Sequence, residues 1–255
     1  FLDQSRYLPD RRDLNRSFPG SPRGSIAARL AHTFMQEIAL KADFGLDLHT
    51  GALDRSNLPQ VRVDLDNPRA RELATKFGAP VVVGASLRDG SLRASAAEHG
   101  IPVLVYEAGE ALRFDELSIR AGVRGVLRVL RFAGMLPARR ERRGAEPMIA
   151  HTTRWVRAPA SGIVTGKTAL GKRVRKGYRL AVITDPLGER SEDVTSPLGG
   201  LIIGRSNLPL AHEGDALFHV AGFDSVSRAE EAVEEFASIH DPALGRKVEH
   251  QLKGT

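Results

Sequence analysis

The strongest constraint on this chain is a regular alternation of helix-like and strand-like segments between residues 25 and 133. Apolar residues at helical spacing predict helices at residues 25–41, 68–77, 91–99 and 115–133. Short apolar runs between them predict buried strands at residues 44–51, 60–65, 80–85 and 102–106. Alternation of this kind favours an α/β fold, in which helices flank a mostly parallel sheet.

The periodicity also predicts which side of two helices is buried. In the first helix, which Ser25 is expected to cap, the inward stripe is Ile26, Leu30, Phe34 and Ile38, widened by Ala27, Ala31 and Met35. In the helix after Asp115, the inward residues are expected to be Leu117, Val123, Val126, Leu127 and Leu130.

Composition excludes several classes of protein. The 255 residues allow one large domain or two smaller ones, and no apolar run approaches the 18 residues of a membrane span. Cysteine is absent, so any metal must be held by His, Asp or Glu. The first residues resemble neither a signal peptide nor a transit peptide and lack an initiator Met. We expect a cytoplasmic protein, with no membrane partner, whose natural chain begins further upstream.

The net charge of +6 comes partly from an Arg-rich run at residues 139–143. A basic chain can bind nucleic acid, but aromatic residues are sparse and no nucleic-acid-binding motif is present. We therefore expect no nucleic-acid partner. A positive field also favours substrates that carry a carboxylate.

The sequence changes character after residue 135. Residues 136–148 form a charged linker with Pro near both ends, and residues 149–224 consist of short strands and turns. APASGIV at 158–164 is echoed by SPLGGLI at 196–202, and KGYRL at 176–180 by EGDAL at 213–217. This duplication resembles the barrel-sandwich fold of biotinyl and lipoyl carriers. A helix and tail follow at residues 225–255.

Carrier domains hold a modified Lys on the hairpin between their two halves. Here the hairpin reads TDPLGERSED at residues 184–193 and contains no Lys. We therefore expect a small all-β barrel-sandwich module without a prosthetic group, which covers an active-site mouth or an oligomer interface. A homo-oligomer is compatible with such a module, and the sequence leaves the oligomeric state open.

Three motifs carry the chemistry of the first domain. DLNRSFPG at residues 13–20 is a polar loop in an Arg-rich segment, and FGLDLHTG at 44–51 is a strand that delivers His49 just before a glycine turn. PVLVYEAG at 102–109 is a buried strand that we expect to end on Glu107. Reactive groups of α/β enzymes commonly follow such strands.

These motifs, in this order and spacing, resemble the succinylglutamate desuccinylase/aspartoacylase family of zinc amidohydrolases, which is related to the M14 carboxypeptidases. The resemblance implies a zinc-carboxypeptidase-like α/β domain at residues 1–135 that lacks its N-terminal part. It also implies an amide hydrolase, or deacylase, that uses zinc and acts on an N-acyl amino acid or a similar small amide bearing a carboxylate.

The resemblance also implies roles for single residues. His49 matches a zinc ligand, and Glu107 matches the general base, with Glu110 as its rival. Asn15 and Arg16 match positions that hold the substrate's carboxylate.

Two further arginines are candidates for the substrate site. Arg6 is a weaker match to an arginine that polarises the scissile carbonyl. Arg93, in GSLR at 90–93, is a second candidate carboxylate anchor, and a surface ion pair explains it equally well.

The chain departs from the family in one respect. The first two zinc ligands of the family come from a His-x-x-Glu motif upstream of DLNR, and no such pair precedes His49 here. We expect a fragment of a longer zinc hydrolase. The alternative is a metal-free carboxylate-binding protein, or a chain that is inactive by itself.

Overall fold

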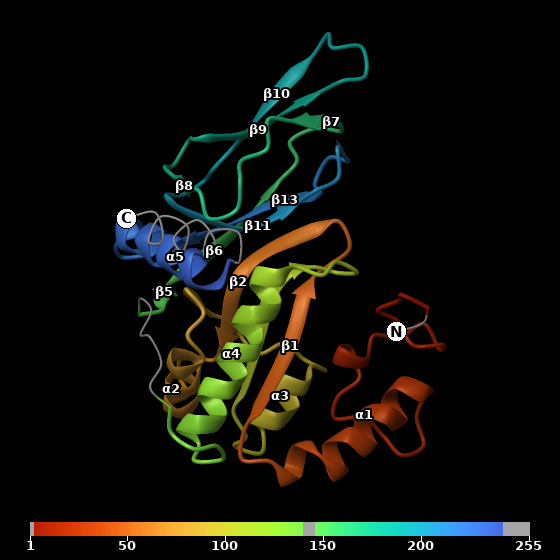
Figure 1. Cartoon of the computed structure of the whole chain (residues 1–255). Helices are drawn as coiled ribbons and strands as arrows, with labels where there is room; N and C mark the ends of the chain where they lie inside the picture. Colours follow the sequence, from red (N-terminus) through yellow and green to blue (C-terminus); the bar gives the residue numbers. More distant parts are fainter. Residues whose placement is uncertain (1–2, 140–145, 242–255) are drawn as a thin grey trace, which may run out of the picture. The chain divides into compact units, whose positions relative to one another are not determined.

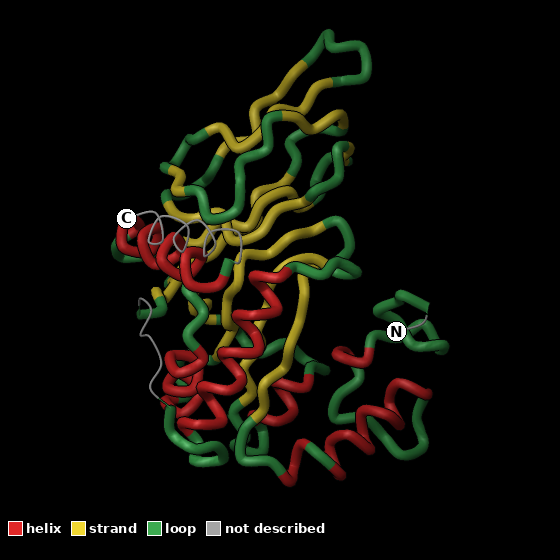
Figure 2. Tube along the Cα trace, viewed as in Figure 1, coloured by secondary structure: helices red, strands yellow, loops and turns green. Residues whose placement is uncertain are grey.

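The computed structural model describes residues 3–139 and 146–241, and their elements are drawn in Figures 1 and 2. The chain divides into two compact units. The first unit contains residues 1–47, 63–73 and 85–105, and the second contains residues 48–62, 74–84 and 106–255. The predicted domain boundaries at residues 135, 148 and 224 stay predictions.

The first unit contains most of the predicted early helices. Its elements are η1 (Leu14–Arg16), α1 (Ile26–Glu37), η2 (Ala39–Lys41) and α3 (Leu92–Ala97), together with the first part of β1 (Gly45–Gly51), α2 (Pro68–Phe77) and β4 (Val103–Glu110). Ser25 caps α1 as predicted, because its Oγ accepts a hydrogen bond from Ala28 N at 3.3 Å. The helix ends at Glu37 and continues as the short 3₁₀ helix η2, so it is shorter than predicted.

The buried side of α1 lies one residue further round the helix than predicted. Ala27, Ala31 and Met35 are buried, whereas Ile26 is 45% exposed and Ile38 is 55% exposed. The loop before the helix explains the shift, since Phe18 packs against the alanine side and Ser21 N donates to Ala28 O at 3.0 Å. Small residues let this loop approach closely, and the larger apolar residues therefore turn outwards.

The second unit is built on a nine-stranded sheet, into which β1 and β4 continue. Its other strands are β2 (Arg55–Val63), β3 (Val81–Gly84), β5 (Met148–Ala150), β6 (Thr152–Arg157), β8 (Arg173–Val174), β11 (Gly200–Ser206) and β13 (Ala216–Gly222). The strand order is β1-β4-β2-β11-β13-β6; β3 also pairs with β2 and β5, and β8 pairs with β11. The predicted strands are present, although β2 begins five residues earlier than expected and β4 ends four residues later.

The nine-stranded sheet contains both strand directions. β3 and β5 are parallel, whereas β11 pairs antiparallel with β2, β8 and β13, and β13 pairs antiparallel with β6. Each of these antiparallel pairs involves a strand of the predicted β module, so the mostly parallel sheet expected for residues 1–135 stays a prediction. The antiparallel part of the nine-stranded sheet arises because β11, from the predicted β module, adds directly to β2.

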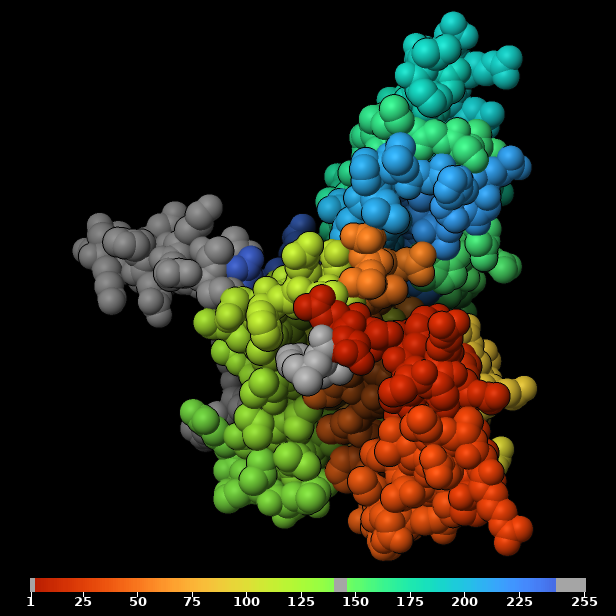
Figure 3. All heavy atoms as spheres, turned by 90° about the vertical axis from the view of Figure 1, so that its right-hand side faces the viewer, coloured from red at the N-terminus to blue at the C-terminus, as the bar shows by residue number. Residues whose placement is uncertain are grey.

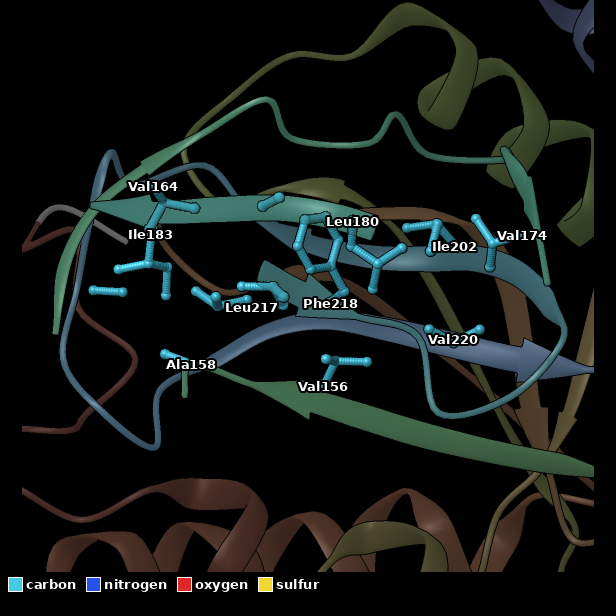
Figure 4. Close-up of a cluster of buried hydrophobic side chains, with 13 residues drawn as sticks. Val156, Ala158, Val164, Val174, Leu180, Ile183, Ile202, Leu217, Phe218 and Val220 are labelled. Carbon is cyan, nitrogen blue, oxygen red and sulfur yellow. The ribbon is translucent and has the colours of Figure 1, made fainter. Parts of the chain in front are cut away.

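A second sheet of four antiparallel strands lies within the β module, in the order β10-β9-β7-β12. These strands are β7 (Gly162–Thr165), β9 (Arg179–Thr184), β10 (Ser191–Thr195) and β12 (Leu210–Ala211). Figure 4 shows the apolar cluster shared by the two sheets, with Leu180 and Ile183 from one and Ile202 and Phe218 from the other. The module is thus a two-sheet sandwich, and within the described residues no closed barrel is found.

The predicted Lys-free hairpin is confirmed. Thr184 of β9 pairs with Ser191 of β10, and residues 185–190 form the turn. Figure 3 shows this hairpin, in cyan, projecting from the module, and Leu187 at its tip is 80% exposed.

Two helices complete the second unit. α4 (Glu116–Phe132) begins as predicted, since Asp115 Oδ1 accepts from Ser118 N at 2.7 Å. α5 (Val226–His240) packs its buried Ala229 against Leu201 and Ile203 of β11, and Figure 1 shows it beside that strand. No helix within the described residues is both long enough and apolar enough to cross a membrane. The tail after residue 241 lies outside the described residues.

The buried side of α4 also differs from the prediction. Ala121, Gly122, Gly125 and Val129 are buried, whereas Val123 is 55% exposed. The glycines of α4 lie directly against the rings of Tyr106 and Phe77. A Cβ on Gly122 would lie 3.0 Å from the ring of Tyr106, and one on Gly125 would lie 2.4 Å from the ring of Phe77.

Candidate functional site

The six predicted site residues fall into two groups. Arg6, Asn15, Arg16 and Arg93 belong to the first unit, and His49 and Glu107 belong to the second. Each group is described within its own unit.

In the first unit, a side-chain amide joins the DLNR loop to the start of α3. Asn15 Oδ1 accepts a hydrogen bond from Leu92 N at 2.9 Å, and Phe18 N donates to Gly90 O at 3.0 Å. These bonds bring η1, which carries Asn15 and Arg16, next to the first turn of α3, which carries Arg93. The fold therefore gathers three of the four predicted substrate residues from two distant parts of the sequence.

Positive charge is concentrated around Arg16. Its Nη1 donates to Asn15 O, and burial, followed by the charge of Arg88, lowers the pKa of the guanidinium below its usual value. A concentration of arginines is stabilised by an anion, which lowers their mutual repulsion. Arg6 differs from the others, because its Nη2 forms an ion pair with Asp13 Oδ2 at 2.7 Å and its charge is largely compensated there.

In the second unit, Glu107 is held from one side by β2. Its Oε2 accepts from Asn57 Nδ2 at 3.1 Å and forms an ion pair with Arg62 Nε at 2.9 Å. The side chain of Glu107 is 19% exposed. Contrary to prediction, the strand does not end at Glu107 but continues to Glu110, so this carboxylate lies within β4.

Glu110, the rival carboxylate, is bound to different partners. Its Oε2 accepts from Asn207 Nδ2 at 2.7 Å and from Ser56 Oγ at 3.2 Å. Asn207 follows β11, so the β module contributes directly to the end of β4. Glu107 has a cation as a partner, whereas Glu110 has neutral donors.

His49 lies on β1, the neighbour of β4 in the sheet. His49 is the fifth residue of its strand and Glu107 is the fifth residue of the adjacent strand. His49 also lines a cavity of about 480 Å³, together with Tyr106, Glu110 and an apolar set from β1 and α4 that includes Leu48, Ile119 and Val123. Burial raises the pKa of the Tyr106 phenol, whose OH donates to Ser118 O at 2.9 Å. The Tyr106 phenol therefore does not release its proton near neutral pH.

The described residues do not complete a zinc site. A hydrolytic zinc site requires three protein ligands, and in residues 3–139 and 146–241 no group of three His, Asp or Glu side chains is arranged to hold a metal. His49 is the single residue that we can assign to such a site from the sequence pattern.

Sequence reasoning missed Asn57, Arg62 and His219. His219 of β13 stacks on Trp155, with ring centroids 4.4 Å apart, and burial, followed by the charges of Arg62 and Arg55, lowers its pKa to about 3. The sequence gives only a weak signal for Arg62, because the alternation VRV at residues 61–63 places it on the side of the strand opposite to the buried valines.

The comparisons with known proteins agree with the fold and the motifs. The family model of the succinylglutamate desuccinylase/aspartoacylase catalytic domain matches residues 1–133. A crystal structure of a succinylglutamate desuccinylase/aspartoacylase from Rhodobacter sphaeroides is 27% identical with a TM-score of 0.78, covering 88% of this chain and 72% of that chain. The product-bound ectoine utilization protein EutE (DoeB) from Ruegeria pomeroyi is 26% identical with a TM-score of 0.79, covering 87% and 71%.

A curated relative matches a shorter stretch. The N-alpha-acetyl-L-2,4-diaminobutyric acid deacetylase of Halomonas elongata is 38% identical over 76 residues, which are 28% of this chain and 22% of the relative. The match thus spans about a fifth of that protein. Together with the family model, which covers more than half of the sequence and all three motifs, these findings show that the chain belongs to the succinylglutamate desuccinylase/aspartoacylase family.

Proposed function

We propose that the complete protein carrying this chain is a zinc-dependent amide hydrolase that removes the acyl group from a small N-acyl amino acid. The observation that carries the proposal is the family match over residues 1–133, which includes DLNR, DLHTG and the Glu-Ala-Gly sequence of Glu107. The printed names of the relatives, a deacetylase and a desuccinylase, favour a deacylase. Zinc is implied by the family. His49 would be one of its ligands, and the other ligands would lie outside the described residues.

Glu107 is the proposed general base. Its carboxylate takes a proton from the attacking water, the water oxygen bonds to the amide carbon, and the proton passes to the amine nitrogen as the C–N bond breaks. The products are a carboxylic acid and a free amine. Partial burial, the hydrogen bond from Asn57 and the ion pair with Arg62 give this carboxylate a fixed position, which a general base requires.

The substrate's own carboxylate is assigned to the arginine-rich loop of the first unit. Asn15 and Arg16 are the primary partners, and Arg93 on α3 adds a second guanidinium. Arg6 is a weaker candidate, because Asp13 already neutralises it. The choice among acetyl, succinyl and aspartyl amides is open. A homo-oligomer and a cytoplasmic location also stay predictions.

A second candidate function is a metal-free carboxylate-binding protein. The observation in its favour is the positive charge around Arg16, to which Arg88 contributes and which can bind a carboxylate without a metal. In that case the arginines of the first unit would bind the ligand and Glu107 would have no catalytic role.

The test uses the complete protein. We would measure bound zinc by elemental analysis and the release of free amine from N-acetyl, N-succinyl and N-aspartyl amino acids. Glu107→Gln is expected to reduce kcat about 10²- to 10⁴-fold, the usual contribution of a general base. Glu72→Gln, which changes an exposed carboxylate that pairs with Arg69, is the matched control and should retain wild-type kcat.

Two results would contradict the proposal. Wild-type turnover by Glu107→Gln would show that Glu107 is not the general base. Binding of a carboxylate ligand by metal-depleted protein, without any hydrolysis, would favour the second candidate.

A further inference from the structure

The carboxylate of Glu107 is bound asymmetrically. Both Asn57 Nδ2 and Arg62 Nε contact the same oxygen, Oε2, at 3.1 and 2.9 Å. Among the described residues, no hydrogen bond reaches the other oxygen, Oε1. The hydrogen bond from Asn57 and the ion pair with Arg62 restrain the rotation of the carboxylate at Oε2, and Oε1 is left to accept a proton.

Asn57 is buried, with 7% of its surface exposed, and the side chain of Arg62 is partly buried, with 25% exposed. A buried polar group without a partner costs roughly 1–3 kcal/mol, and a charged group costs more. Glu107 lowers this cost for Asn57 Nδ2, to which it is hydrogen-bonded, and for the charge of Arg62, with which it forms an ion pair. Asn57 Oδ1 and Arg62 Nε have no hydrogen-bond partner among the described residues.

Asn57 belongs to a row of paired residues that crosses the sheet from β2 to β6. Asn57 of β2 lies opposite Gly204 of β11, Gly204 lies opposite His219 of β13, and His219 lies opposite Trp155 of β6. Residues paired in this way share one face of the sheet. The β module therefore supplies the surroundings of Asn57.

Gly204 leaves the room that Asn57 occupies. A Cβ at this position would lie 2.8 Å from Asn57 Oδ1 and 3.3 Å from His219 Cβ. Any larger residue would displace the amide that contacts Glu107. Asn57 can therefore keep this position only if residue 204 has no side chain.

His219 fills the space beyond Gly204 without adding charge. It is 2% exposed and stacks on Trp155, and the guanidinium of Arg55 lies 4.7 Å from the centroid of the Trp155 ring. Burial and the charges of Arg62 and Arg55 lower the pKa of His219 to about 3, so the imidazole is neutral near pH 7 and adds no positive charge to that of Arg62.

We propose that Arg62 and Asn57 are positioning residues for Glu107, that they direct Oε1 towards the attacking water, and that Gly204 of the β module, with His219 beside it, leaves the space in which Asn57 is held. This inference rests on the proposed hydrolase function. It gives the β module a part in the reaction, because β11 provides the space for Asn57, whose amide donates to the general base.

The test measures kcat and KM separately in the complete protein, with the N-acyl amino acid that the wild type hydrolyses fastest. Arg62→Gln and Asn57→Ala are expected to lower kcat about 10- to 100-fold, because a displacement of about 1 Å at the reacting atoms has an effect of this size. KM should stay within about twofold, since neither side chain is assigned to the substrate. Arg62→Lys should recover part of the lost kcat.

Gly204→Ala tests the support from the β module. It changes no atom of Glu107, Arg62 or Asn57, and it should still lower kcat at unchanged KM. Arg120→Gln is the matched control, since Arg120 pairs with Glu116 on the exposed side of α4 and its loss should leave kcat unchanged.

The outcomes separate this inference from the proposed function. If the wild type hydrolyses the amide and folded Arg62→Gln and Asn57→Ala keep its kcat, the inference is overturned and the hydrolase stands. If Arg62→Gln does not fold, kcat of Arg62→Lys and Asn57→Ala decides in the same way. If the wild type hydrolyses no amide, the proposed function fails and takes the inference with it.

Discussion

At the scale of single residues, Glu107, the proposed general base, is contacted by Asn57 and Arg62 of β2. His49, Glu107 and Asn15 could be singled out because each lies in a short motif with recognisable chemistry. Arg62, Asn57 and His219 lie in ordinary strand sequences, and their importance depends on contacts between β2, β4 and β13. No spacing within the sequence encodes such contacts.

The buried His219 predicts a pH dependence of stability. Its pKa falls from the ordinary value of 6.5 to about 3 in the folded protein, chiefly because burial disfavours the charged form. The unfolded chain therefore binds more protons than the folded protein between these two values. Stability from this group is present above pH 6.5 and is lost as the pH falls towards 3, by about 1.4 kcal/mol per pH unit at most.

His219→Phe should reduce that slope, because phenylalanine keeps an aromatic ring against Trp155 and cannot be protonated. Denaturant unfolding at pH 7, 6, 5 and 4 measures the slope. His151→Phe is the control, since His151 is exposed and pairs with Asp224. An unchanged slope in His219→Phe would show that His219 is not the group responsible.

At the scale of elements, helix existence could be predicted and helix orientation could not. Capping residues and apolar spacing gave the start of α1 and the extent of α4. In α1 the buried residues are the three that widened the predicted stripe, Ala27, Ala31 and Met35, and in α4 they are mostly small residues outside the predicted set. Alanine and glycine are buried because they permit close packing, and close packing is a property of the neighbouring loop or ring.

This packing predicts that Gly125→Ala destabilises the protein, although alanine is favoured over glycine in a helix by about 1 kcal/mol. The new Cβ would lie 2.4 Å from the Phe77 ring, and overpacking of this kind typically costs about 1–3 kcal/mol. Thermal unfolding should show a lower Tm. Arg120→Ala, at an exposed position of α4, is the comparison and should change Tm little. A higher Tm in Gly125→Ala would mean that α4 can move away from Phe77 at no cost.

At the scale of the second unit as a whole, one sheet continues from β2 into β11 of the predicted β module. The composition changes after residue 135, which predicts a separate β module, yet β11 pairs with β2 across more than a hundred residues of sequence. Hydrogen bonds from Asn207 to Ser56 and Glu110 strengthen the same junction. The sequence near β2 or β11 does not indicate this pairing, because a strand at the edge of a sheet can pair with any strand that has a free edge.

This continuity predicts that a destabilising change in the core of the sandwich also lowers the local stability of β2. Phe218 of β13 is buried in the apolar cluster between the two sheets (Figure 4), and Phe218→Ala should cost about 3–5 kcal/mol. Because β13 pairs with β11 and β11 pairs with β2, amide hydrogen exchange should accelerate in residues 55–57 as well as in β11 and β13. Leu187→Ala, at the exposed hairpin tip, is the control and should leave exchange in β2 unchanged. If β2 keeps its protection in Phe218→Ala while β11 and β13 lose theirs, the β module opens independently of β2, and its support of the Asn57 position would not depend on the stability of the sandwich.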